Sequence, residues 1–354
     1  MFADRPRAAA ALAENGENHV TDIGLLLGGL VLLVIGGELL VRGAVAIAER
    51  LGMSPLLIGL TLVGFGTSTP ELVTSVQAAM AGSPGIAVGN IVGSNIANIL
   101  LILGLSAIIT PVAVQSNALR RDGVVVVLTA LLFVLVSYTY TLDRIAGVIF
   151  VGLLVAYIYY AYRQETVPAA ASDGHTSAFE KAEAYDELHD GPIRHQAETK
   201  TWAEKLGPVV PLIMALGGLA IVVLGGKLLV DGAIGIARGY GMSEAVIGLT
   251  IVAVGTSMPE FVTSVVAAIR KHGDVALGNI MGSNIYNVLG IGGVTALISP
   301  TEVPAQIANF DNLVMLAASA AMFAVAWSGY RISRIEGAAL LAGYIAYVFV
   351  LLPK

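Results

Sequence analysis

The sequence predicts an all-α polytopic membrane protein with ten transmembrane helices, arranged as two inverted-topology five-helix repeats. The first observation is composition: 56% of the 354 residues are hydrophobic and only 12% are charged, whereas about a quarter of the residues in a soluble domain are charged. The second is that apolar runs of about 20 residues, long enough to cross a bilayer, recur along the chain. The third is an internal duplication.

The duplication is visible when residues 64–111 are aligned with residues 253–300 without a gap, because 26 of the 48 positions are identical. The match continues outward, since Gly36 and Gly43 meet Gly225 and Gly232 at the same offset. Five spans per repeat is an odd number, so equivalent segments must cross the membrane in opposite directions. Such inverted repeats are common among secondary transporters.

The apolar segments divide the chain into four regions. Residues 1–22 form a polar N-terminal tail, 23–162 the first repeat, 163–207 a linker and 208–354 the second repeat. The spans expected in the first repeat are 23–41, 55–80, 86–109, 123–138 and 145–162. Those expected in the second are 208–230, 244–269, 275–298, 312–328 and 335–352.

The linker differs from both repeats, because it is rich in charged residues and holds three of the five histidines. Charged segments of low hydrophobicity cannot build a core, so we expect a solvated loop with at most a short helix around 178–189. Thirteen of the 19 Lys and Arg residues fall on its side of the membrane. The positive-inside rule then predicts a cytoplasmic linker, with both termini outside the cytoplasmic (inner) membrane.

Two copies of one motif carry the strongest functional signal: Gly-Thr-Ser-Thr-Pro-Glu at 66–71 and Gly-Thr-Ser-Met-Pro-Glu at 255–260. Each places a carboxylate, Glu71 or Glu260, directly after a proline deep in an apolar segment. An ionisable residue inside a membrane span is costly, and neither glutamate has a basic partner within its own span. We therefore expect both to be functional.

The proline of each motif has no backbone N–H, so it frees carbonyl groups in the preceding turn, at Gly66 and Thr67 and at Gly255 and Thr256. Backbone at membrane depth stays unpaired only where it lines a cavity or meets a ligand. Freed carbonyls, neighbouring hydroxyls and one carboxylate make an all-oxygen half-site. Two such half-sites facing each other suit a hard cation such as calcium, whereas a zinc or copper site would need His or Cys ligands.

A second matched set of polar residues follows each motif. Ser94 and Asn98 are four residues apart and share one helix face, as do Ser283 and Asn287. They can point neutral oxygens toward the carboxylates. The alternative is that the amides of these segments pack helices and hydrogen-bond between them. We favour that alternative for the remaining asparagines, namely Asn90, Asn95, Asn279 and Asn284.

Other charged residues in apolar segments have structural explanations. Glu38 and Arg42 are four residues apart, which predicts an ion pair on one helix face. Asp122 and Asp311 stand where spans begin, and there we expect helix N-caps.

At the two proline-glutamate motifs, and at Gly-Asn-Ile-Val-Gly-Ser-Asn (89–95) with its second copy, the sequence resembles the cation/calcium antiporter superfamily, specifically its prokaryotic sodium/calcium exchanger branch. The resemblance covers nearly the whole chain. It implies a central site in which Glu71 and Glu260 bind calcium with the carbonyls of Thr67 and Thr256. It also implies that sodium uses the same carboxylates and four serine hydroxyls, those of Ser68, Ser257, Ser94 and Ser283. The first and sixth helices of the family are thought to slide across the rest.

Two differences from other branches of the superfamily narrow the choice of coupling ion. Potassium-dependent relatives carry an acid where this chain has Asn287, and Asn98 is also an amide. Proton-coupled relatives carry a glutamate soon after the Gly-Asn pair, whereas Asn90 and Asn279 are followed by Ile and by no nearby Glu. Both differences favour sodium.

These observations predict a secondary active antiporter that exchanges sodium for calcium by alternating access. Two uncompensated carboxylates resist occlusion in a low-dielectric site, and calcium or several sodium ions neutralise them. The expected partners are calcium, sodium and the lipid bilayer, with no cofactor, nucleic acid or obligatory protein partner. The alternatives are a proton-coupled exchanger of calcium or other divalent cations, and a cation channel. An enzyme is disfavoured, because no His-Glu-x-x-His pair is present and no histidine base accompanies the Ser/Thr motifs.

Overall fold

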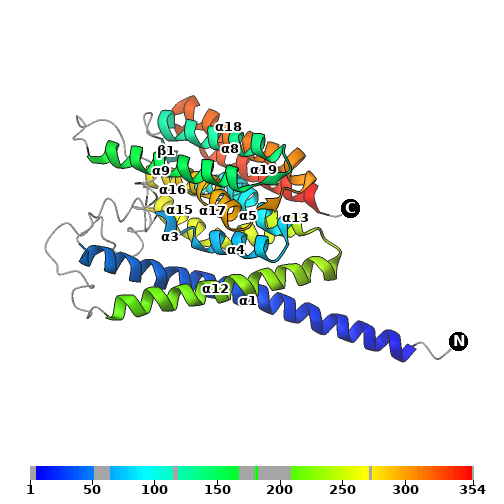
Figure 1. Cartoon of the computed structure of the whole chain (residues 1–354). Helices are drawn as coiled ribbons and strands as arrows, with labels where there is room; N and C mark the ends of the chain where they lie inside the picture. Colours follow the sequence, from blue (N-terminus) through cyan, green and yellow to red (C-terminus); the bar gives the residue numbers. More distant parts are fainter. Residues whose placement is uncertain are drawn as a thin grey trace.

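The computed structural model describes residues 5–51, 64–114, 119–166, 179, 181, 209–270 and 273–352, and these are almost entirely helical (Figure 1). The helices of the first half are α1 (Arg5–Arg50), α3 (Gly64–Gly66), α4 (Thr69–Met80), α5 (Pro84–Ile96), η2 (Ala97–Leu103), α6 (Gly104–Ile109), η3 (Leu119–Gly123), α8 (Val124–Ser137) and α9 (Arg144–Thr166). The described part of the expected polar tail, from Arg5 onward, continues into α1 as helix.

The second half repeats this order of elements. Its helices are α12 (Val209–Tyr240), α13 (Glu244–Ile247), η4 (Gly248–Val252), α14 (Ala253–Thr256), α15 (Met258–Ile269), α16 (Gly273–Ile285), η5 (Tyr286–Gly292), α17 (Gly293–Ile298), η6 (Ile307–Asp311), α18 (Asn312–Gly329) and α19 (Arg334–Leu351). The segments labelled η have π-helical hydrogen bonding.

Seven helices in the described part of the chain are long and apolar enough to cross a membrane, or eight if one bent pair counts as a span. They are Val20–Ala48, Pro84–Ile109, Arg144–Gln164, Val209–Tyr240, Val275–Ile298, Ile307–Gly329 and Arg334–Leu351, with Glu244–Ile269 as the bent pair. Part of the span expected at 55–80 lies outside the described residues, and α8 has only 14 residues. The chain is thus a helical multi-pass membrane protein, and the count of ten spans stays a prediction.

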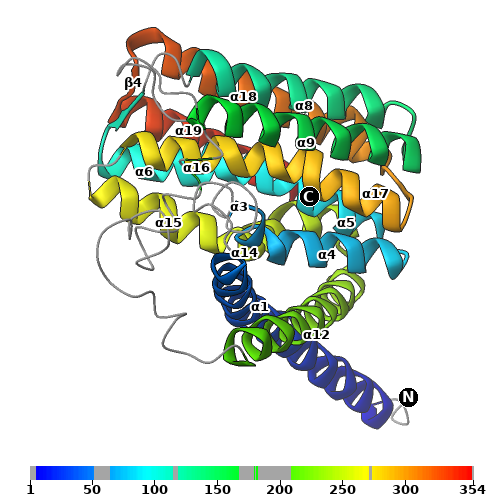
Figure 2. The same ribbon diagram turned by 60° about the vertical axis from the view of Figure 1, so that its left-hand side comes forward.

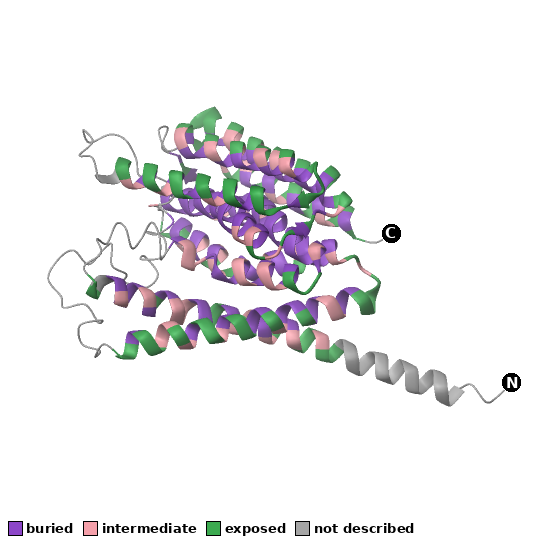
Figure 3. Ribbon diagram, viewed as in Figure 1, coloured by how far each residue is buried: buried purple, intermediate pink, exposed green. Residues whose placement is uncertain are grey.

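Burial separates a central layer from an outer one. Within one apolar stretch of 18 residues in each helix, 83% of the residues of Pro84–Ile109 and 89% of those of Val275–Ile298 are buried, against 28% in α1, α12 and α19. Figure 3 shows the same contrast, with buried ribbon in the middle and exposed ribbon outside. Because the exposed residues of the outer helices include many large hydrophobic side chains, this outer layer is suited to contact with lipid. The two central segments carry the second matched set of polar residues.

Helices α1 and α12 form a pair of their own, which crosses below the remaining helices in Figures 1 and 2. Glycines at seven-residue intervals on each helix make the contact: Gly29, Gly36 and Gly43 on α1 and Gly218, Gly225 and Gly232 on α12. A Cβ atom on Gly218 would lie 2.4 Å from the backbone nitrogen of Leu40, so the two backbones nearly touch. Small residues permit this close approach between membrane helices.

The direction of this contact is antiparallel. Gly29 lies against Leu229, whereas Gly43, further along α1, lies against Ala215, which comes earlier in α12. The helices α1 and α12, which stand at equivalent positions of the two sequence repeats, therefore run in opposite directions.

Each proline-glutamate motif lies at a break between two helices. In the first half, Thr67 and Ser68 form a turn between α3 and α4, and Pro70 occupies the first turn of α4. In the second half, α14 and α15 meet at Ser257 with a bend of 51°. Proline is well placed in a first helical turn, where its missing N–H costs nothing. The expected breaks at both motifs are confirmed.

The all-α expectation misses four strands of two residues each, which pair across the halves. β1 (Val112–Ala113) pairs antiparallel with β4 (Arg331–Ile332), and β2 (Thr141–Leu142) pairs antiparallel with β3 (Thr301–Glu302). Each ladder thus joins a loop of one repeat to a loop of the other. Such short ladders leave no mark in the hydrophobic pattern, which explains why the sequence does not reveal them.

Candidate cation site

The two motif glutamates are buried and linked to each other's motif. Glu71 on α4 is 1% exposed and Glu260 on α15 is 2% exposed. The hydroxyl of Ser68 donates to Glu260 Oε1 at 3.2 Å, and the hydroxyl of Ser257 donates to Glu71 Oε1 at 3.0 Å. Each serine comes from one half and each acceptor from the other. The two breaks therefore face each other and form one centre.

One oxygen of each carboxylate has no hydrogen-bond partner among the described residues, namely Oε2 of Glu71 and Oε2 of Glu260. The same holds for Oδ1 of Asn98 and for both polar side-chain atoms of Asn287. Buried polar atoms are normally hydrogen-bonded, so a cluster of unpaired oxygens requires an explanation. Oxygen ligands for a cation provide one, because a carboxylate oxygen that meets a metal ion needs no hydrogen bond.

Asn98 and Asn287 lie in the π-helical segments η2 and η5, which directly follow α5 and α16. A π-turn inserts a residue into an α-helix and is frequent at functional sites. The amide of Asn98 donates to Asn284 Oδ1 at 3.0 Å, so this pair also joins the two halves.

Two other asparagines brace the broken helices, as the packing alternative predicts. The amide of Asn90 donates to Ser75 Oγ at 2.9 Å and to the carbonyl of Glu71 at 3.1 Å. Asn279 repeats both contacts with Ser264 and Glu260, at 2.8 and 3.4 Å. Each asparagine therefore fixes the backbone that carries its glutamate, and the packing interpretation is confirmed for both.

Replacement of Asn90 by leucine is expected to destabilise the fold by about 1–3 kcal/mol. The change strips the carbonyl of Glu71 of its interhelical donor, and it removes the interhelical acceptor of the Thr256 hydroxyl, 2.9 Å away, which leaves that hydroxyl with carbonyls of its own helix. The thermal unfolding midpoint of the detergent-solubilised protein measures the effect. Asn95→Leu is the control, because the hydrogen bond that the structure gives the Asn95 amide goes to the carbonyl of Ile91 in its own helix. Equal shifts for the two variants would contradict the bracing role.

The remaining residues proposed from the sequence surround this centre in different ways. The hydroxyl of Thr67 reaches the carbonyl of Gly64 at 3.5 Å, and that of Thr256 is held by Asn90. Ser94 donates to the carbonyl of Ala253 at 3.4 Å. Ser283 lies beside Glu260, with 3.5 Å between its Oγ and Oε1. The structure thus gathers residues of α4, α5, α15 and α16 at one place.

Lys181 is a site residue that the sequence reasoning missed. Its side chain is fully buried, and its ammonium group donates to Ser283 Oγ at 2.6 Å and to Glu260 Oε1 at 3.1 Å. The expectation of a solvated side chain in the linker is therefore wrong for this residue. Glu260 has a basic partner after all, from outside its own span. No local pattern could have revealed it, because the contact joins residues 79 positions apart.

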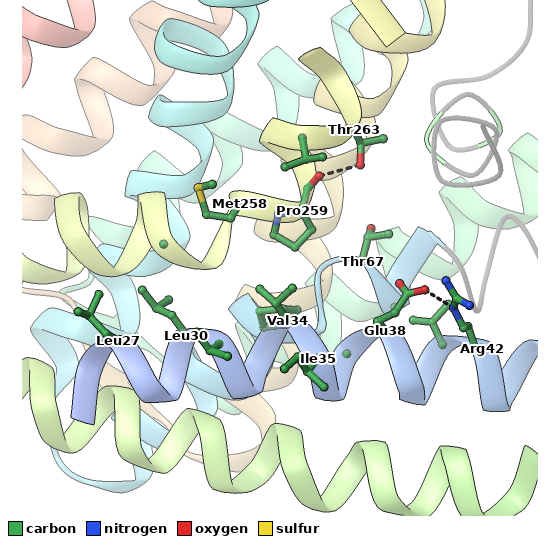
Figure 4. Close-up of a pocket in the computed structure, with 17 residues that line it drawn as sticks. Leu27, Leu30, Val34, Ile35, Glu38, Arg42, Thr67, Met258, Pro259 and Thr263 are labelled. Atoms are coloured by element: carbon green, nitrogen blue, oxygen red, sulfur yellow. Dashed lines mark hydrogen bonds and ion pairs between the residues drawn. The ribbon is translucent and has the colours of Figure 1, made fainter. Parts of the chain in front are cut away.

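A cavity of about 930 Å³ lies between α1 and the two breaks (Figure 4). Gly66, Thr67 and Pro70 line it from the first break, and Gly255, Met258 and Pro259 from the second. Apolar side chains of α1 form the opposite wall, and the expected ion pair between Glu38 and Arg42 is confirmed at one end. The helix α1 thus covers a space that adjoins both motifs.

The candidate centre contains two carboxylates. No group of three or more His, Cys, Asp or Glu side chains suited to a metal ion occurs among the residues that the structure describes. A cation held here would therefore depend on neutral oxygens in addition to Glu71 and Glu260. Such a ligand set matches calcium and sodium better than metals that prefer nitrogen or sulfur.

Comparison with known proteins places this arrangement in a family. The profile of the family described as "Sodium/calcium exchanger protein" matches residues 21–163 and 210–352, that is, both halves without the linker. The chain belongs to this exchanger family. The resemblance drawn from the motifs is confirmed.

Relatives from other organisms align with this chain over nearly their whole length. MaX1 of Methanosarcina acetivorans, named as a sodium/calcium exchanger, is 35% identical and aligns with 92% of this chain and 97% of its own. CaxA of Alkalimonas amylolytica, named as a candidate antiporter, is 38% identical with the same coverage. A solved structure of the sodium-calcium exchanger NCX_Mj, soaked with Na⁺ and Sr²⁺, has a TM-score of 0.60 and 31% identity and covers 94% of this chain and 99% of that one.

The structure also corrects the expectation for two aspartates. Asp311 makes no side-chain capping bond to α18, so the N-cap expectation is wrong for it. Its Oδ1 instead accepts from the hydroxyl of Tyr347 on α19 at 2.9 Å. At the equivalent place, Asp122 accepts from Tyr157 on α9 at 3.4 Å. Each aspartate therefore links the start of one outer helix to a tyrosine of another.

Proposed function

We propose that the protein is a secondary active antiporter that exchanges sodium for calcium across the cytoplasmic membrane by alternating access, with Glu71 and Glu260 as the central cation ligands. The observation that carries this proposal is the pair of buried carboxylates, one from each half, each with an unpaired oxygen among the described residues. Family membership supports the same activity. The family is one of transporters, so no catalytic residue is proposed.

The proposed ligands are the residues that the structure gathers around this pair. The carbonyls of Thr67 and Thr256 join the two carboxylates for calcium, which takes six to eight oxygens in flexible geometry. Sodium uses the carboxylates and serine hydroxyls, while the amides complete the sphere. The serines are Ser68, Ser257, Ser94 and Ser283, and the amides are Asn98 and Asn287.

The charge of the centre couples the movement of sodium to that of calcium. Two ionised carboxylates in a dry site repel each other and lack solvation, and the one ammonium group beside them compensates only one charge, so the unloaded carrier should not pass through an occluded state. Calcium neutralises both charges, and several sodium ions do the same. Either load permits the switch, which makes exchange obligatory and prevents leak.

The inverted-repeat architecture with ten spans is part of the proposal. The antiparallel contact of α1 and α12 supports it, because these helices occupy equivalent positions of the two sequence repeats. The cross-pairing of β1 with β4 and β2 with β3 supports it too, since each ladder joins one half to the other. The proposed division is a tail at 1–22, repeats at 23–162 and 208–354, and a cytoplasmic linker at 163–207, with both termini outside.

Alternating access requires a part that moves. We assign this movement to the pair α1 and α12, because it packs as a separate layer and because α1 walls the cavity beside both breaks (Figure 4). Most of the side chains that α1 presents to this cavity are apolar, and an apolar surface can slide past its neighbours without a change of hydrogen-bond partners. Displacement of this pair along the central helices would open the site to one side and close it to the other.

The test is radiolabelled calcium uptake into proteoliposomes that are loaded with sodium and diluted into sodium-free buffer with a proton ionophore. Uptake is expected to follow the outward sodium gradient and to vanish when internal sodium is replaced by choline. Uptake that ignores sodium and follows a pH gradient without ionophore would replace the proposal with proton-coupled exchange. Single-channel currents in planar bilayers would replace it with a channel.

A further inference from the structure

Lys181 places a positive charge inside the proposed cation site. Its ammonium nitrogen lies 2.6 Å from Ser283 Oγ and 3.1 Å from Glu260 Oε1, and its side chain is 0% exposed. An ion buried at this depth is costly unless it is paired and hydrogen-bonded. The ammonium meets that requirement with one carboxylate oxygen and one hydroxyl oxygen, both from residues proposed here as sodium ligands.

The charge balance of the site makes Lys181 a competitor of calcium. Glu71 and Glu260 together carry −2, and the ammonium reduces this to −1. A calcium ion bound in addition to Lys181 would leave the centre at +1 in a low-dielectric environment, whereas calcium bound in its place leaves the centre neutral. Two cations a few ångströms apart in such a site repel each other strongly, because little solvent screens them. Calcium and the ammonium therefore exclude each other.

The position of Lys181 breaks the symmetry between the halves. In the second half, Ser283 accepts from the ammonium. In the first half, the equivalent Ser94 donates to the carbonyl of Ala253, and Glu71 Oε1 accepts from Ser257. The internal duplication predicts no such difference. It arises from the linker, a segment that occurs once in the chain and that the two family matches leave out.

A neighbouring residue of the linker helps to hold the ammonium in place. Phe179 is half-buried and packs against the main hydrophobic core, and both Phe179 and Lys181 have helical backbone. An apolar anchor two residues before the lysine limits how far the ammonium can move from Glu260. Such tethering gives the ammonium a high effective concentration at the site. The ammonium can therefore compete with free ions.

We propose that Lys181 is a tethered cation that occupies one ion position of the exchange site, so that transported ions must displace it in order to bind. The inference rests on the proposed function, because it takes Glu260 and Ser283 as ion ligands. Its consequence is a threshold concentration of calcium or sodium, below which the site is not loaded. When calcium and sodium are scarce on the linker side, Lys181 holds the site, and when either ion is abundant it is expelled.

Equilibrium binding of radiolabelled calcium to the full-length, detergent-solubilised protein tests the competition. Lys181→Gln removes the charge and keeps most of the length, so it is expected to bind calcium about tenfold more tightly than the wild type in sodium-free buffer. Lys181→Arg retains the charge and should bind as the wild type does. Lys227→Gln removes the same charge from an exposed position on α12 and should change nothing.

Lysine labelling with an acetylating reagent, read out by mass spectrometry, gives a second measure that a purely structural lysine would not affect. Addition of calcium is expected to raise modification of Lys181 several-fold and to leave that of the exposed Lys227 unchanged. Unaltered labelling of Lys181 at saturating calcium would overturn the proposal, because it would show that the ammonium stays in place.

The outcomes separate the two proposals. If Lys181→Gln binds calcium no more tightly than a wild type that shows sodium-dependent uptake, the role of Lys181 is refuted and the exchange function stands. If neither the wild type nor Lys181→Gln binds calcium, both proposals fail. Weaker binding by Lys181→Gln would show that the lysine supports the site, which is the opposite of competition.

Discussion

Replacement of Glu71 or Glu260 by glutamine is expected to abolish sodium-dependent calcium uptake, with a loss of more than about 100-fold in rate. Glutamine keeps the size and the acceptor oxygen that receives the hydroxyl of Ser257 or Ser68, so the protein should still fold. The charge is lost. A divalent ion about 4 Å from a carboxylate gains roughly 8 kcal/mol at an effective dielectric constant of about 20, before desolvation. Loss of even half of that exceeds the roughly 2.8 kcal/mol that a 100-fold change requires.

Each glutamate is required, because the two carboxylates share one ion, and Glu260→Gln also leaves the ammonium of Lys181 without its carboxylate partner. Glu302→Gln is the matched control, since it removes an exposed carboxylate from β3, away from the two breaks. Uptake is measured in proteoliposomes at equal protein content, and elution as a single monodisperse species verifies the fold. Retention of near-wild-type, sodium-dependent uptake by both glutamine variants would exclude Glu71 and Glu260 as the central ligands.

The core of this site could be predicted from sequence because its parts are local. A proline breaks the helix within one turn of itself, and a carboxylate next to it needs a ligand or a partner at membrane depth. The duplication then indicated that the second motif supplies the second half. The reciprocal contacts of Ser68 with Glu260 and of Ser257 with Glu71 follow from two like half-sites placed face to face.

The parts that could not be predicted depend on contacts between distant segments. Hydrophobic periodicity identified the linker as polar, but it carries no information on where one lysine of that linker would go. The same limit applies to Asp311, whose position at the start of a helix suggested a cap, whereas the hydroxyl of Tyr347 on another helix decides its role. Burial inside a site and long-range pairing arise only when the helices have assembled.

The glycine contact between α1 and α12 leads to the second large effect. Replacement of Gly218 by leucine is expected to destabilise the protein by more than about 3 kcal/mol and to stop exchange. Overpacking usually costs about 1–3 kcal/mol when neighbouring side chains can adjust. Here a Cβ atom would lie 2.4 Å from the backbone nitrogen of Leu40 and 2.8 Å from the carbonyl oxygen of Gly36. Because backbone atoms cannot turn away as side chains do, the two helices must separate.

The adjacent residue Gly217 provides a control on the same turn, because a Cβ atom there meets nothing within 4 Å. Gly217→Leu should be neutral or slightly stabilising, since leucine favours a helix more than glycine does, by about 1 kcal/mol. Gly29 and Gly28 form the corresponding pair on α1, with 2.5 Å to the nitrogen of Leu229 and open space respectively. Thermal unfolding midpoints and sodium-dependent uptake are compared within each pair. If α1 and α12 move together as one body, leucine at Gly29 and leucine at Gly218 should both stop sodium-dependent uptake. Equal uptake and equal unfolding midpoints for the Gly218 and Gly217 variants, and for the Gly29 and Gly28 variants, would show that the close contact is not required.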